Sequence, residues 1–205
     1  MKNALILAAV AVLVTACGPS EPRVIDTTQT TGRVRSMQKL SPVDFQEAAL
    51  NSVNKMLASK QFARYLTQYQ AGNTDQPLLM LSEVVNKTST AVNTQVLTER
   101  ISTALSEDAD MVQVTTAAAG AGQHRDEANA QVRDLENDIN FDQSTVQQRG
   151  TLKAPNLSLS GTIVEQRVQE SGTTELTYFF SLKLTDLRSG VQVFSTTQEI
   201  GRQQD

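Results

Sequence analysis

Apolar positions between residues 42 and 70 recur at intervals of three and four, which is the spacing of one helix face. Ser41 and Pro42 stand before the first group, and both residue types are favoured where a helix begins. Ser59 precedes a second group, which Gly72 follows. The pattern predicts one helix from residue 42 and another over residues 62–69. The first group comprises Phe45, Ala48, Ala49, Val53, Met56 and Leu57.

The middle of the chain alternates between short apolar runs and helical spacing. Residues 78–85 form an apolar run after Pro77, and residues 111–114 form another; both have the character of buried strands. A helix is predicted between them, and a further helix over residues 125–139. Strand, helix and strand in succession indicate an α/β arrangement. The apolar positions of the two helices are Val92, Val96, Leu97, Ile101, Ala104 and Leu105, then Ala128, Val132, Leu135 and Ile139.

The last third of the chain changes to a period of two, which is typical of strands with one buried face. Turn residues at Ser171-Gly172 and over residues 186–190 separate the apolar runs. The pattern predicts two successive antiparallel hairpins. The predicted fold class is α/β (α+β): a small mixed sheet with C-terminal antiparallel hairpins, flanked by helices. The alternating apolar positions are Leu157, Leu159 and Ile163, then Leu176, Tyr178, Phe180, Leu182 and Leu184.

The N-terminus has the pattern of an export signal. A basic residue, Lys2, precedes an apolar run that is too short to span a membrane comfortably. Small residues then lead into Cys17, the only cysteine of the chain, and this resembles the bacterial lipobox. We therefore expect a lipoprotein signal peptide over residues 1–16 and lipid attachment at Cys17. Because Gly18 rather than an acidic residue follows, resemblance to this class implies delivery to the inner leaflet of the outer membrane, facing the periplasm.

Residues 17–41 are rich in Thr, Ser, Gln and Pro and show neither helical nor strand periodicity. We expect them to form a lipidated flexible tether, with a globular domain over residues 42–205. Fully extended, such a tether reaches roughly 80 Å. With Cys17 lipidated no thiol remains for a disulfide, so the domain must be stabilised by its core.

The inventory of reactive residues gives no positive sign of catalysis. The one histidine, His124, lies in a polar helix start and has no visible partner, so neither a hydrolase triad nor a zinc site is expected. The Gly120-Ala121-Gly122 loop lacks the Lys-Ser/Thr of a phosphate-binding loop. The formal net charge of −4 does not suggest nucleic-acid binding. We expect no enzyme activity, no metal and no cofactor.

Three segments together resemble the LpoB family of outer-membrane lipoproteins. They are the run LLMLSEVVNKT at residues 78–88 with its following helix, the strand entry APNLSLSG at 154–161, and the closing hairpin LKLTDLRSGVQVFS at 182–195. The resemblance covers roughly residues 43–201. It implies a fold similar to the N-terminal domain of TolB and a partner in the periplasmic domain of a bifunctional penicillin-binding protein. The implied function is non-catalytic activation of peptidoglycan synthesis, which affects cell shape.

Two alternatives remain open at this stage. The fold is shared by structural or assembly lipoproteins of flagellar and secretion apparatus at the outer membrane, and an unrecognised enzyme is the third reading. For partner contact we single out a strand end with polar residues and two further cations. Turn chemistry and solvated charge are the competing interpretation of the same side chains. The candidate contact residues are Asn86, Lys87, Thr88, Lys153 and Arg188.

Overall fold

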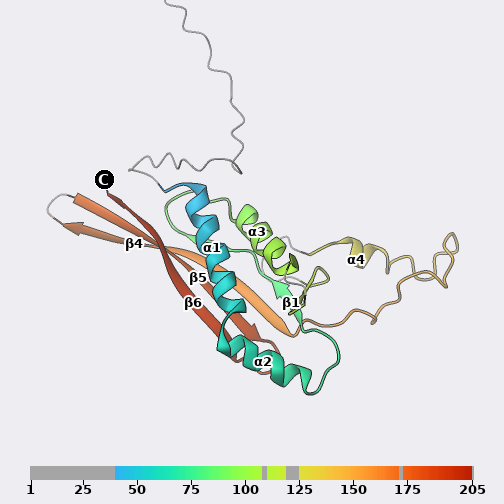
Figure 1. The fold of residues 1–205 in the computed structure, drawn as a ribbon. Helices are drawn as coiled ribbons and strands as arrows, with labels where there is room; N and C mark the ends of the chain where they lie inside the picture. Colours follow the sequence, from blue (N-terminus) through green and yellow to red (C-terminus); the bar gives the residue numbers. More distant parts are fainter. Residues whose placement is uncertain (1–39, 108–109, 119–124, 171–172, 205) are drawn as a thin grey trace, which may run out of the picture. The chain divides into compact units, whose positions relative to one another are not determined.

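The computed structural model describes residues 40–107, 110–118, 125–170 and 173–204. The chain divides into two compact units, Met1–Ser36 and Met37–Asp205, and all described residues belong to the second. Its elements in chain order are α1 (Pro42–Leu57), α2 (Lys60–Gln70), β1 (Leu78–Leu81), β2 (Val85–Lys87), α3 (Thr94–Glu107), β3 (Gln113–Thr115), α4 (Ala128–Gln131), β4 (Leu157–Glu170), β5 (Thr173–Asp186) and β6 (Gln192–Gln204). Figure 1 shows them in sequence colours.

Local hydrogen bonds explain where the first two helices begin. The backbone N–H of Ser41 donates to the Asp44 carboxylate at 2.9 Å, so Asp44 satisfies a donor at the start of α1. The Ser59 hydroxyl accepts from the backbone N–H of Phe62 at 3.1 Å and caps α2. The first helix begins where Ser41 and Pro42 predicted. The second, predicted over residues 62–69, begins two residues earlier, at Lys60 directly after Ser59.

The strands form one mixed sheet in the order β3-β1-β4-β5-β6, with β2 also paired to β4. β1 is parallel to both β3 and β4, and β2 is parallel to β4. β4, β5 and β6 are antiparallel neighbours, joined as two successive hairpins. The fold class and the C-terminal hairpins agree with the prediction from sequence.

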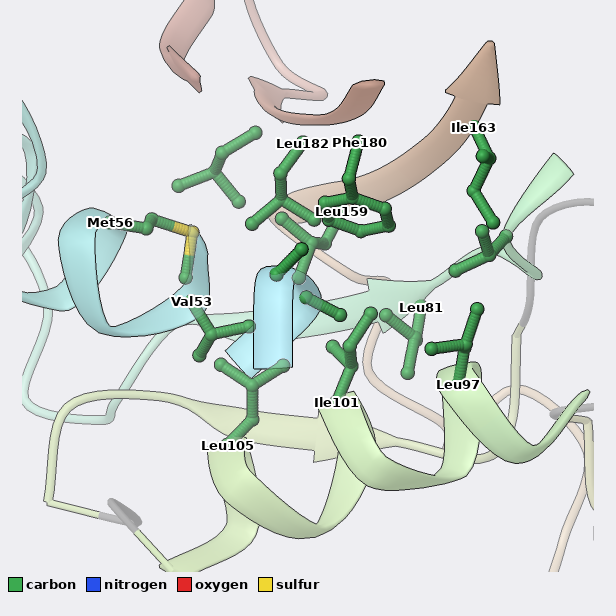
Figure 2. Packing of buried hydrophobic residues seen from close by; sticks show 14 of the residues in the cluster. Val53, Met56, Leu81, Leu97, Ile101, Leu105, Leu159, Ile163, Phe180 and Leu182 are labelled. Atoms are coloured by element: carbon green, nitrogen blue, oxygen red, sulfur yellow. The ribbon is translucent and has the colours of Figure 1, made fainter. Parts of the chain in front are cut away.

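One face of the sheet is buried under helices. α1 packs against β5 and β6 and lies beside α3. Figure 2 shows Leu97, Ile101 and Leu105 of α3 directed toward the interior of the cluster, which Val53 of α1 also enters. The apolar half of each alternating strand pattern is buried, including all five positions of the β5 stripe. The hairpin strands therefore supply much of the core.

The apolar run at residues 78–85 was predicted to form one strand, but it does not form a continuous strand. It divides into β1 and β2, and Val84 between them is buried. The Val84 N–H donates at 3.0 Å to the hydroxyl of Thr98 in α3 instead of to a strand. A methyl group added at Gly161 of β4 would lie 3.0 Å from Val84 Cγ2, so the missing side chain at Gly161 makes room for Val84.

The predicted helix over residues 125–139 is wrong. Only the four-residue α4 is helical there, and turns follow it. Ile139, expected on the buried face, is 96% exposed, and Val132 is also exposed. Asn137 has a left-handed backbone, with φ of 71°. Because most helical stability in proteins comes from burying an apolar face, a segment without a surface to cover does not continue as a helix.

Candidate functional site

The predicted contact residues lie toward opposite ends of the sheet. Lys87 pairs with Val164, which is seven residues along β4 from Leu157. Leu157 pairs with Asp186, and Arg188 follows in the turn between β5 and β6. At about 3.3 Å per residue, the β4 backbone between these two levels spans roughly 23 Å. The five residues therefore do not form one compact site.

At the end of β2, Asn86 and Thr88 are bonded to the loop itself. The Asn86 side-chain amide donates to the Thr90 carbonyl at 2.8 Å. Its carbonyl accepts from the Thr88 N–H at 3.0 Å and from the Thr88 hydroxyl at 2.8 Å. These bonds shape a tight turn. The Lys87 side chain, by contrast, is exposed, and no ion pair within the described ranges includes it.

The same loop is held onto the hairpin by two longer-range contacts. The Thr90 hydroxyl and the Tyr178 hydroxyl lie 2.8 Å apart, and Ser89 donates to the Glu165 carboxylate through its N–H and its hydroxyl, each at 2.8 Å. The bonds from the Ser89 backbone and side chain lower the pKa of Glu165. Their contribution to stability is present at neutral pH and is lost as the pH falls through that lowered pKa.

The opposite end of the sheet joins four segments around Asn156. The Asn156 side-chain oxygen accepts from the Leu78 N–H at 2.9 Å and from the Tyr69 hydroxyl at 3.3 Å. Its backbone carbonyl accepts from the Leu187 N–H at 2.8 Å. Asn156, immediately before β4, therefore ties α2 and β1 through its side chain and the turn after β5 through its backbone. Sequence reasoning did not single out Asn156, because its partners are distant in the chain.

An aromatic pair from α2 lies at the same end. The rings of Tyr65 and Tyr69 are stacked with their centroids 6.1 Å apart. Burial, assisted by the Asp186 and Tyr69 charges, raises the pKa of Tyr65 to about 12. Tyr65 thus stays neutral at physiological pH and acts as a packing residue. The spacing of four residues in a helix was the sequence signal for this pair.

The two predicted cations at this end have different surroundings. Lys153 is ion-paired with Asp75, and that hydrogen bond lowers the pKa of Asp75. Arg188 lies in the β5–β6 turn, where its backbone N–H donates to the Asp186 carboxylate at 3.0 Å and Gly190 takes a left-handed φ of 72°. Its side chain is exposed, and among the described residues it has no ion-pair partner. Arg188 is the more available cation for a partner.

The sequence also did not reveal that the last strand, β6, forms one edge of the sheet. β6 pairs only with β5 among the described strands, whereas the other margin of the sheet is built from the short strands β3 and β2. In Figure 1 the strand runs up to the C-terminus. Its alternation is weaker than that of β5, because polar Thr196 and Gln198 pair with buried Leu182 and Phe180.

Within the described residues no group of three or more His, Cys, Asp and Glu could hold a metal ion. A cavity of about 470 Å³ lies beside β3 and is lined by neutral side chains such as Val112, Gln113 and Thr115. No described helix is both long and apolar enough to cross a membrane. The predicted lipid site Cys17, the tether up to residue 39, His124 and the Gly120–Gly122 loop lie outside the described residues.

Several solved structures resemble the chain at low identity. The C-terminal domain of LpoB from Escherichia coli is 15% identical, with a TM-score of 0.40, and the match covers 77% of this chain and 98% of that one. The NMR structure of Escherichia coli LpoB is 14% identical, with a TM-score of 0.38, covering 97% and 91%. A PelC dodecamer from Paraburkholderia phytofirmans is 16% identical, with a TM-score of 0.30, covering 60% and 72%.

No curated protein sequence matches the chain significantly. A family model, by contrast, matches residues 44–200, from the first turn of α1 into β6. That model is described as the peptidoglycan-synthase activator LpoB, and it covers nearly all of the described domain. On this match, rather than on the distant structural likenesses, the chain belongs to the LpoB family of peptidoglycan-synthase activators.

Proposed function

We propose that this chain is a non-catalytic outer-membrane lipoprotein that binds the periplasmic domain of a bifunctional penicillin-binding protein and activates it. The family match over residues 44–200 carries the proposal. The lipobox-like residues before Cys17 support an anchor in the inner leaflet of the outer membrane, facing the periplasm. The tether would let the anchored domain search for a partner held in the opposite membrane.

An activator that takes no part in the reaction must bind the active state of the synthase more tightly than the inactive state. A ligand with equal affinity for both states shifts neither, however tightly it binds. Preference for the active state by a factor of 10 stabilises that state by about 1.4 kcal/mol. The described domain suits this role, because its buried core and hydrogen-bonded loops would present a defined surface to the synthase.

Purified lipidated protein is expected to raise the rate of glycan polymerisation by a bifunctional synthase of the same organism about 5- to 100-fold, the range of ordinary coupling free energies. The assay follows lipid II consumption in detergent, with a monofunctional transglycosylase as the control enzyme. No stimulation of any bifunctional synthase would contradict the proposal. A stable ring of the protein by electron microscopy, together with no stimulation, would instead favour a structural assembly role.

We propose Arg188 as a contact residue in preference to Lys87, Asn86 and Thr88. The hydrogen bonds of Asn86 and Thr88 are already used within their own loop. Lys153 lies at the same end of the sheet as Arg188, but it is ion-paired with Asp75. Arg188 and Lys87 both have exposed side chains without an ion-pair partner among the described residues, and we choose Arg188 because its guanidinium can bind a carboxylate through two hydrogen bonds.

Arg188→Glu is expected to weaken synthase binding about tenfold, because charge reversal turns an attraction at the contact into a repulsion. Lys87→Glu, toward the other end of β4, is the matched control and is expected to leave affinity within about twofold. Surface plasmon resonance at two salt concentrations measures both. Equal losses for the two variants would point to general electrostatic attraction, and an effect of Lys87→Glu alone would move the contact to the β2 end.

A further inference from the structure

We propose that the free edge of β6 is where the synthase docks, through an extended segment that adds to the sheet as an outer strand. The inference rests on the proposed function and deepens it by naming the mode of contact. Addition of a strand to a sheet edge is a recurrent form of protein recognition, in which main-chain hydrogen bonds supply affinity.

The hydrogen-bond pattern shows which groups of β6 face outward. The Asp186 N–H donates toward the β6 side, to the Val191 carbonyl at 2.9 Å, and the Leu187 N–H donates toward the β4 side, to Asn156. Backbone groups alternate between the two sides of an antiparallel strand. The β5 residues that pair with Phe194, Thr196 and Gln198 therefore bond to them, and Ser195 and Thr197 point their backbone groups away from β5.

The outward backbone groups of Ser195 and Thr197 have no partner among the described residues. No backbone group of residues 192–198 is hydrogen-bonded to any described residue outside β5. The register is regular over residues 194–199, between shifts at Leu184/Thr185 and Tyr178/Phe179 of β5. The side chains of Ser195 and Thr197 are exposed on the sheet face opposite the helices. They point out of the plane of the sheet and so do not cover the backbone groups at its edge.

The middle of the edge lacks the usual protection against strand addition. Exposed edges commonly carry charged residues, especially lysine, or proline and β-bulges, which prevent pairing with another chain. Between the two register shifts, residues 194–198 of β6 include no charged residue and no proline, whereas the opposite margin consists of the three-residue strands β3 and β2. This regular, unprotected stretch is therefore the part of the sheet margin that an added strand could pair with.

The proposed contact at Arg188 lies next to the edge of β6, and this favours the synthase over a second copy of the chain as the partner that binds there. The turn that carries Arg188 leads directly into Gln192, the first residue of β6. A partner whose negative surface meets Arg188 would already lie beside the start of the edge. The backbone donors of Ser195 and Thr197 would then align an extended segment without requiring a particular side-chain sequence.

Thr197→Pro tests the edge because proline removes the outward N–H and is tolerated where that N–H faces solvent. Thr197→Ala is the matched control, since both variants lose the 3.0 Å contact between the Thr197 and Ser181 hydroxyls and only the proline loses the donor. With full-length lipidated protein in detergent and a purified bifunctional synthase of the same organism, Thr197→Pro is expected to raise Kd at least about tenfold. Thr197→Ala is expected to bind like the unaltered protein.

Unchanged affinity of a folded Thr197→Pro protein would overturn the docking site while leaving the proposed function intact. If Thr197→Pro does not fold, amide hydrogen exchange of the unaltered chain decides. The Ser195 and Thr197 amides should exchange fast alone and slowly with the synthase; no added protection would overturn the inference. Protection that depends on the protein's own concentration would identify a second copy as occupant and also overturn it. Absence of any synthase binding would refute the docking site and the proposed function together.

Discussion

Phe180→Ala is expected to lower the free energy of unfolding by about 3–5 kcal/mol, the usual cost of removing a buried aromatic side chain. Phe180 is fully buried in the middle of β5 and packs among Leu159, Leu182 and Ile163 (Figure 2). Its ring packs closely against Gly161, where an added methyl group would be only 3.2 Å from Phe180 Cζ. Because a glycine cannot collapse into the vacated volume, the cavity would persist. Urea denaturation followed by circular dichroism measures the loss.

Phe179→Ala is the matched control, because the neighbouring phenylalanine lies on the opposite face of the sheet and is only partly buried. The same substitution there is expected to cost about 1 kcal/mol. Equal costs at the two positions would show that the described burial of β5 is wrong. A similar comparison of protein levels in the periplasm would link stability to abundance.

Cys17→Ser is expected to abolish palmitate incorporation and remove the protein from the outer-membrane fraction. Each buried CH₂ of an acyl chain contributes about 0.8 kcal/mol, and stable anchoring takes more than one chain. None of the described helices has the length and apolar character needed to cross a membrane. Metabolic labelling with an alkyne fatty acid, followed by membrane fractionation, measures both effects.

Gly18→Asp separates lipidation from sorting. An acidic residue after the cysteine is expected to preserve labelling but retain the protein at the inner membrane. Undiminished labelling of Cys17→Ser would refute lipid attachment at this residue. A Cys17→Ser domain that still activated the synthase when purified, but not in cells, would show that the anchor acts by raising the local concentration of the domain.

Elements that bury an apolar pattern and carry their own start signals were predictable from sequence. Ser41 and Ser59 mark α1 and α2, and the strict alternation around Phe180 marks β5. Each of these signals lies within a few residues of the structure it specifies. The family resemblance had the same basis, since the quoted segments are the strands and the hairpin of the sheet.

What the sequence did not reveal depends on contacts between distant residues. The apolar spacing at Val132 and Ile139 was genuine, but both side chains are exposed and no described element covers them, so the helix stops after α4. The break between β1 and β2 depends on Thr98 and Gly161, which lie 14 and 77 residues from Val84. The separation of Lys87 from Arg188, likewise, depends on the register of β4 and could not be deduced from spacing.

The position of β4 has a consequence for the order of folding. β4 lies between β1 and β5, although it begins only at Leu157. A chain that crosses a membrane from its N-terminus delivers α1, α3 and β1 before their central neighbour is present. β4, β5 and β6 can pair locally as hairpins, while β1 and β2 must close loops of 70 residues or more, which is slower. The last quarter of the chain is therefore expected to fold first as hairpins, and the earlier segments are expected to remain unfolded and accessible to chaperones until it is present.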